Sequence, residues 1–204
     1  KMIRQAMKLD EKGIKLLCPT LAFNLGQEFM MKSFCNLGEV LGRTPEQIKT
    51  ALMKAMEASK TFRNDLEEKG KALVREIKPG ERVFVIISKL YGVVDPVLNM
   101  GIPDQLMKRG YKVISFSDLM DNDVFDEYPN LYWSFAQHIL GAARLVKQNP
   151  DWFAVYLTHH GCGPDSIVTH YFREIMGDKP YLNIEVDEHA SDVGVITRLE
   201  AFLN

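Results

Sequence analysis

Val83-Phe84-Val85-Ile86-Ile87 is an unbroken apolar run in which four of the five residues are β-branched. Strands with one face in water alternate apolar and polar residues, whereas strands of parallel sheets are covered on both faces and are apolar throughout. Pro79-Gly80 stands just before the run and separates it from a helical pattern. We therefore expect residues 83–87 to be a strand inside a parallel sheet.

Strand and helix patterns alternate from this run to the end of the chain. Strand-like runs recur at residues 111–116, 153–157 and 181–186, with helical patterns between and after them. The polar segment 118–129 is expected to be a long loop. Such alternation is typical of strand–helix–strand units, so the expected fold class is α/β, a four-stranded parallel Rossmann- or flavodoxin-like sheet with flanking helices.

The chain ahead of Pro79 has a mainly helical pattern. Residues 14–17 are a brief strand candidate, which Cys18-Pro19-Thr20 ends because proline cannot donate to a strand ladder. Apolar residues with helical spacing follow, up to Gly42. We expect one helix there.

A second, longer helix is expected after Thr44-Pro45-Glu46-Gln47, which resembles a capping box with proline at the first helical position. The apolar spacing after it persists to Pro79 and predicts about 30 helical residues, with Gly70 as a candidate break into two helices. We thus expect two parts: a helical segment with a long connector helix over residues 1–79, and an α/β domain over residues 80–204.

Composition and charge exclude several classes of protein. The chain has 25 basic and 27 acidic residues, a net charge of −2, and no basic cluster, so nucleic acid is not an expected partner. No window approaches the roughly 20 apolar residues that span a bilayer, and the first residues lack the layout of a signal peptide. We expect a cytoplasmic protein without a membrane partner. Because Lys1 is not an initiator methionine, we also expect a piece of a longer polypeptide.

The three cysteines, Cys18, Cys35 and Cys162, are an odd number with no close pair. This argues against a disulfide framework and against a zinc site built by this chain alone. A metal site remains compatible with the sequence if other chains or other parts of the polypeptide supply ligands.

The loop Gly161-Cys162-Gly163, which follows the strand candidate 153–157, is the sharpest local feature. Flanking glycines allow positive φ and a close approach of the backbone, and Pro164-Asp165-Ser166 then opens a helix whose amides favour an anion or thiolate. A tight turn with a buried cysteine is the alternative interpretation. Because the phosphate-binding glycine patterns of dinucleotide and P-loop sites are missing, a nucleotide enzyme is disfavoured.

Two further groups of polar residues stand at the expected strand ends. His159-His160 alternate in direction if they extend their strand, so one faces the site unless both are solvated or cap a helix. Asp187, Glu188, His189 and Asp192 gather acid and imidazole after the last strand, for proton transfer, for polar support of a site, or for helix capping alone. The loop 91–101 follows the first strand and completes this edge, where open α/β sheets bind ligands.

Three motifs carry a resemblance to a known family: Tyr91 to Pro103, Gly161 to Ser166, and Glu185 to Leu203. Over residues 80–204 the chain resembles 2-hydroxyacyl-CoA dehydratases and acyl-CoA dehydratase activase-related proteins, in particular the C-terminal part of the large activase-fused type. In dehydratases of that family, cysteines hold a [4Fe–4S] cluster, and an ATP-dependent activator delivers the electron that enables radical removal of water from a 2-hydroxyacyl-CoA.

The resemblance implies that Cys162 is one thiolate ligand of a [4Fe–4S] cluster, which it shares with residues outside this chain. The expected surroundings of that cofactor are Gly161, Gly163, Asp165, Ser166, Asp187 and His189, and no residue is assigned to catalysis. The implied partners are the ATP-dependent activator or upstream domains of the same polypeptide, together with an acyl-CoA. The isolated chain is expected to be inactive, and Cys18 and Cys35 are expected to be ordinary packing cysteines.

Two alternatives stay open beside electron transfer. One is a scaffold or docking domain without catalysis, which binds the activator and in which Cys162 is structural. The other is a thiol enzyme that uses Cys162 with His159 or His189.

Overall fold

The computed structural model describes residues 2–22, 25–119, 126–159, 161–187 and 189–204. Contacts between Cα atoms divide the chain into two compact units, residues 1–62 and 63–204. The division falls inside helix α3 (Pro45–Arg75). The boundary expected from composition, between residues 79 and 80, stays a prediction.

Residues 1–62 contain helices α1 (Met2–Ala6), α2 (Gly26–Val40) and the start of α3. The predicted capping box is confirmed: the Gln47 amide donates to Thr44 Oγ1 at 3.3 Å, and the Thr44 amide donates to Gln47 Oε1 at 3.1 Å. The strand predicted at residues 14–17 is wrong, because these residues have no regular structure. A short apolar run forms a strand only beside another strand, and all four described strands lie in residues 63–204.

Helix α3 runs through Gly70 without a break, so the predicted division of this helix at Gly70 is wrong. A Cβ added at Gly70 would lie 1.9 Å from the carbonyl oxygen of Asp118, in the short 3-10 helix η2 (Phe116–Leu119). Glycine is thus present because the two backbones approach closely. The expected loop 118–129 begins inside η2, and residues 120–125 lie outside the described residues.

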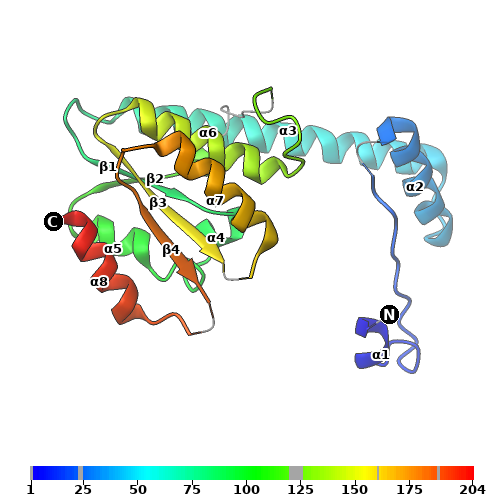
Figure 1. Ribbon diagram of the computed structural model, residues 1–204. Helices are drawn as coiled ribbons and strands as arrows, with labels where there is room; N and C mark the ends of the chain where they lie inside the picture. The colour runs from blue at the N-terminus through cyan, green and yellow to red at the C-terminus, as the bar shows by residue number, and fades with distance from the viewer. Residues whose placement is uncertain (1, 23–24, 120–125, 160, 188) are drawn as a thin grey trace. The chain divides into compact units, whose positions relative to one another are not determined.

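The sheet contains four parallel strands, β1 (Val83–Ile87), β2 (Lys112–Ser115), β3 (Trp152–His159) and β4 (Leu182–Val186) (Figure 1). Their order is β2-β1-β3-β4. Val85 pairs with Ile114 of β2 on one side and Ala154 of β3 on the other. The predicted α/β class is confirmed. The strand order is the flavodoxin-like one, in which β2 lies on one side of β1 while β3 and β4 lie on the other side.

Helices cover both faces of the sheet. One face packs on α6 (Ser134–Gln148) and α7 (Gly163–Met176), where the Tyr156 ring stacks on Phe172 at 4.4 Å between centroids. The other face packs on α5 (Ile102–Lys108) and α8 (Asp192–Leu203), whose buried residues include Leu106 and Leu199. All five residues of β1 are buried, as a strand covered on both faces requires.

Helix α4 (Leu90–Val94) follows β1 directly and occupies the start of the segment 91–101 that was expected to be a loop. Among the described residues, no helix is both long enough and apolar enough to cross a membrane.

Candidate functional site

The carboxyl ends of β1 and β3 meet at the point where the strand order reverses. From β1 the chain leaves toward β2, and from β3 it leaves toward β4, so the two following loops diverge and leave room between them. Ser88 and Lys89 follow β1, His159 ends β3, and Cys162 is the residue that precedes α7. This is the position at which sheets of this topology bind ligands.

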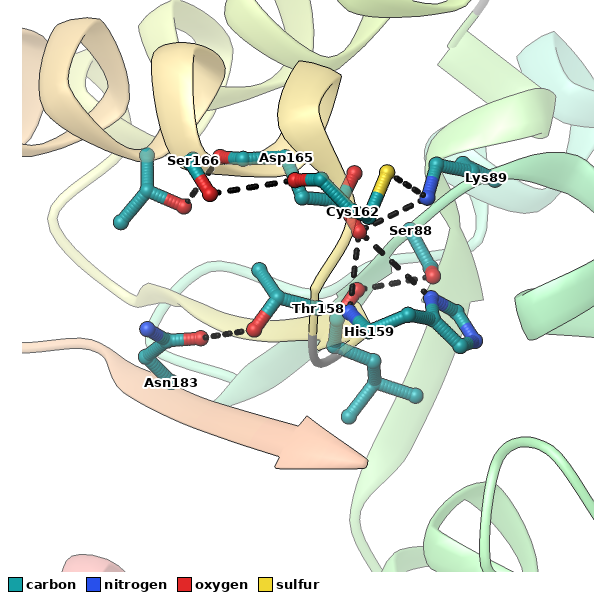
Figure 2. Close-up of polar contacts among 10 residues, drawn as sticks. Ser88, Lys89, Thr158, His159, Cys162, Asp165, Ser166 and Asn183 are labelled. Atoms are coloured by element: carbon teal, nitrogen blue, oxygen red, sulfur yellow. Dashed lines mark hydrogen bonds and ion pairs between the residues drawn. The ribbon is translucent and has the colours of Figure 1, made fainter. Parts of the chain in front are cut away.

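The Lys89 side chain connects the segment after β1 with the segment after β3. Its ammonium Nζ donates to Cys162 Sγ at 2.8 Å and to Asp165 Oδ2 at 2.8 Å (Figure 2). Lys89 is 8% exposed and Asp165 is 4% exposed, whereas Cys162 is half-buried. The buried charges therefore compensate each other, as buried ions require, while the sulfur stays at the rim.

Asp165 is fixed from several sides in the first turn of α7. Besides the Lys89 ammonium, its Oδ2 accepts the backbone N–H of His159 at 2.9 Å. Its own carbonyl accepts the Thr169 hydroxyl at 2.7 Å. Because the carboxylate is tied to β3 through His159 and to β1 through Lys89, the position of the ammonium near sulfur is set by backbone elements.

Burial and charge shift two pKa values here in opposite directions. Burial lowers the pKa of Lys89, but the hydrogen bonds to Asp165 and Cys162 outweigh it, and the pKa ends above its ordinary value. Burial, followed by the nearby charge of Lys89, lowers the pKa of His159. At neutral pH the site thus holds an ammonium and a neutral imidazole.

The His159 ring is packed closely. Tyr91 lies over it at 5.4 Å between ring centroids, and a Cβ added at Gly92 would come within 3.0 Å of its Cε1 and 2.4 Å of Ser88 Oγ. Both ring nitrogens are buried, and neither has a hydrogen-bond partner among the described residues. Nδ1 lies 3.6 Å from Asp165 Oδ2. The Ser88 hydroxyl donates to the Leu157 carbonyl at 2.8 Å, so it links the segment after β1 to β3.

The predicted glycine loop has the expected geometry. Gly161 has φ +68°, and among the described residues beyond the chain neighbours no heavy atom lies within 4 Å of a Cβ built at Gly161 or at Gly163. Ser166 donates its hydroxyl to the Cys162 carbonyl at 3.1 Å, so it supports the turn and not the sulfur. The structure therefore brings Cys162 and Asp165 together with Lys89 and leaves open space beside the loop.

The predicted residues after β4 have local contacts. Asp187 Oδ1 accepts the His189 amide at 2.9 Å, and the Ser191 hydroxyl, which caps α8, accepts the Gly194 amide at 3.3 Å. The described hydrogen bond to the sulfur comes instead from Lys89, which follows β1. The role of Asp187 and His189 at a cofactor stays a prediction. His160, Glu188 and the side chain of Asp192 lie outside the described residues.

Sequence reasoning missed Lys89, the residue that organises the site. A signal was present, since Ser88-Lys89 directly follows the strand 83–87 and a polar residue at the carboxyl end of a buried strand is a candidate ligand contact. The predicted ligand-binding edge included the loop 91–101 and did not include Lys89. The partner residues stand 73 and 76 positions away, which no local pattern reveals.

The donor set at this edge fits one ligand of a metal cluster. A four-iron cluster takes four thiolate ligands, and Cys162 is the cysteine at the sheet edge, while Cys18 and Cys35 belong to residues 1–62. Within the described residues no group of three or more His, Cys, Asp or Glu side chains is arranged to hold a metal ion. The half-buried sulfur and the open space at Gly161 and Gly163 suit a ligand shared with residues outside this sequence.

Comparison with known families gives a match over the first part of the chain. The family model described as CoA enzyme activase uncharacterised domain matches residues 1–119, more than half of the 204 residues. The match contains the helical segment, β1, Lys89 and β2, and it ends before the Cys162 loop. No curated protein and no solved structure matches the chain.

Proposed function

This chain belongs to the family described as CoA enzyme activase uncharacterised domain, and from that premise we propose that it takes part in iron–sulfur-linked electron transfer that supports the dehydration of 2-hydroxyacyl-CoA. In this proposal Cys162 is one thiolate ligand of a [4Fe–4S] cluster, and residues outside this sequence supply the others. The observation that carries the proposal is the position of the half-buried Cys162 where the loops after β1 and β3 diverge.

The residues around Cys162 have distinct parts in this proposal. Among the described residues, a Cβ built at Gly161 or Gly163 would meet no heavy atom within 4 Å beyond the chain neighbours, which supports room for an added group at this loop. Lys89 donates a hydrogen bond to the Cys162 sulfur, and hydrogen bonds to cluster sulfurs are among the features that set the reduction potential. Asp165 keeps Lys89 in place. A bound cluster supplies one-electron transfer, and the protein supplies its position and electrostatic environment.

The proposed partner is the ATP-dependent activator, or an upstream domain of the same polypeptide with that activity. The substrate of the assembled system is a 2-hydroxyacyl-CoA. The natural assembly must bring its remaining ligands to the edge at which Cys162 lies, since this edge offers one thiolate.

The test is an anaerobic iron and sulfide analysis of the full natural polypeptide with its partner present. Cys162→Ser is expected to lower iron per polypeptide and the broad visible absorption, whereas Cys35→Ser, a half-buried cysteine of residues 1–62, leaves both unchanged. Equal iron content in the wild type and in Cys162→Ser would exclude Cys162 as a ligand.

A second candidate is a docking domain for the activator, and a specific observation favours it. Helices of this topology begin at the carboxyl edge of the sheet, and exposed apolar side chains stand at several of these beginnings. They are Leu90, Tyr91 and Val94 on α4, Val97 after it, Tyr132 and Trp133 before α6, Ile167 on α7 and Val193 on α8.

Binding measurements separate this candidate from the first. Val97→Asp and Tyr132→Asp, at side chains 76% and 86% exposed, are expected to weaken activator binding at least about tenfold without changing iron content. Met53→Asp, an exposed methionine of residues 1–62, is the matched control and should bind normally. Unchanged binding in both edge variants would exclude docking at this edge.

A further inference from the structure

The contact between Lys89 and Cys162 joins an amine to an oxidisable sulfur at 2.8 Å, a separation below the sum of the van der Waals radii of nitrogen and sulfur. Neither atom is free to move far. Lys89 is 8% exposed and its Nζ is also bound to Asp165, while Cys162 precedes α7 and its amide donates to the His159 carbonyl at 3.2 Å. The geometry therefore keeps the two reacting atoms together in advance of any reaction.

A small oxidant has access to this sulfur. Cys162 is half-buried, and positions beside it at Gly161 and Gly163 are open. Cys18 and Cys35 differ, because among the described residues neither accepts a hydrogen bond from a lysine. The chain thus contains one oxidisable sulfur with an amine in contact and two comparison sulfurs without one.

We propose that Cys162 and Lys89 form an oxidation-dependent covalent pair, a sulfenamide, when the sulfur carries no metal. A peroxide first oxidises the thiol: one peroxide oxygen becomes the sulfenic acid oxygen, and the other leaves as water. The Lys89 amine then attacks the sulfenic sulfur, an S–N bond forms, the S–O bond breaks, and a second water leaves. Sulfur has lost two electrons and the peroxide has gained two.

The protons of the second step also balance. Lys89 enters the step as an ammonium paired with Asp165, and two protons leave its nitrogen as the S–N bond forms. One departs with the hydroxide of the sulfenic acid as water, and the other is released to the solvent. The Asp165 carboxylate lies 2.8 Å from Nζ and keeps that nitrogen beside the sulfur.

The experiment uses the metal-free chain with Cys18→Ser and Cys35→Ser, so that disulfides within it cannot form. Hydrogen peroxide is added in equimolar amount and the intact mass is measured. A sulfenamide removes two hydrogens, so the mass is expected to fall by about 2 Da, and a thiol reductant is expected to restore it. A tryptic map should show the peptide around Cys162 linked at Lys89, with cleavage after Lys89 lost.

Matched variants decide which amine reacts. Lys89→Arg keeps a positive charge but removes the amine, and its oxidised form should instead be about 16 Da heavier and react with a sulfenic acid trap. Lys112→Arg, a lysine paired with Glu76 away from the sulfur, should behave as the unchanged chain. A tryptic map with Lys89 unmodified and Cys162 oxidised would overturn the proposal. Because no iron is involved, this result is independent of whether Cys162 ligates a cluster.

Discussion

Residues 63–204 and residues 1–62 have apolar side chains in similar helical patterns, yet they bury them very differently. All twelve of the largest fully buried side chains lie in residues 63–204. Among the described residues of 1–62, Leu9 is the one large apolar side chain that is buried, and Phe62 is 66% exposed. The difference teaches that helical spacing is enough to make a helix, whereas a core also needs a surface for the helix to cover.

The parallel sheet supplies that surface in residues 63–204. Its central strands β1 and β3 are buried on both faces, so α6 and α7 cover one side and α5 and α8 cover the other. Residues 1–62 contain no described strand, and their long helix begins with a capping box whose hydrogen bonds need no tertiary partner. Four changes test this contrast.

Truncation of the core has the largest expected effect. Phe172 is fully buried and stacked on Tyr156, so Phe172→Ala should lower the free energy of unfolding by about 3–5 kcal/mol. Met53→Ala, at a position 60% exposed in α3, should change it by less than about 0.5 kcal/mol. Denaturant unfolding of both variants measures the difference, and equal losses would contradict the contrast between the two regions.

The next effect compares a buried ion pair of residues 63–204 with an exposed ion pair of residues 1–62. Asp165→Asn leaves the buried Lys89 ammonium without its carboxylate and should lower the free energy of unfolding by about 3 kcal/mol. In residues 1–62, Arg4 and Asp10 form a pair at 2.9 Å that is exposed on both sides. Asp10→Asn should produce no measurable change in the same unfolding experiment, because water solvates both groups. A large effect of Asp10→Asn would show that residues 1–62 are better packed than described.

A smaller change in stability is expected from substitution of Gly70 in α3, and none or a slight gain at Ser59 of the same helix. Alanine is a better helix former than glycine by about 1 kcal/mol, so propensity alone predicts that Gly70→Ala stabilises the protein. A methyl group at Gly70 meets the Asp118 carbonyl, so we expect a loss of about 1–3 kcal/mol instead. Ser59→Ala, on an exposed part of the same helix, should be neutral or slightly stabilising. The sign of the change in melting temperature at Gly70 decides between the two explanations.

The smallest expected effect is on the pH dependence of the free energy of unfolding. All five histidines follow residue 62, so the histidine contribution belongs to residues 63–204. The pKa of His159 is held below its ordinary value of 6.5, so the unfolded chain takes up the proton first as pH falls. Stability from this residue is fully present above pH 6.5 and decreases below it. Denaturation at pH 8 and at pH 5 should show a smaller decrease for His159→Gln than for the wild type, and identical decreases would contradict the shift.

Sequence patterns predicted the sheet well for a physical reason. A strand covered on both faces must be apolar throughout, so residues 83–87 were assigned with their observed bounds. The brief strand predicted at residues 14–17, Ile-Lys-Leu-Leu, has no neighbouring strand among the described residues and does not form. Helix α4 was missed because glycine and two valines are poor helix formers, and position after β1 outweighs propensity there.

The site was predictable only in part. The glycine loop placed Cys162 at the strand end, since positive φ at Gly161 and the proline after Gly163 are local requirements. Lys89 depends on the pairing of β1 with β3, which is a tertiary property. Gly70 was interpreted as a helix breaker for the same reason, since its neighbour Asp118 is far away in sequence.

The separation of 73 positions between Lys89 and Cys162 has a consequence for folding. The chain that separates them contains β2 and α6, so the ammonium reaches the sulfur only after β1 and β3 have found each other across that long loop. A nascent or partly unfolded chain therefore presents Cys162 as a bare thiol. The chemical reactivity of the Cys162 thiol during refolding therefore reports when β1 and β3 pair.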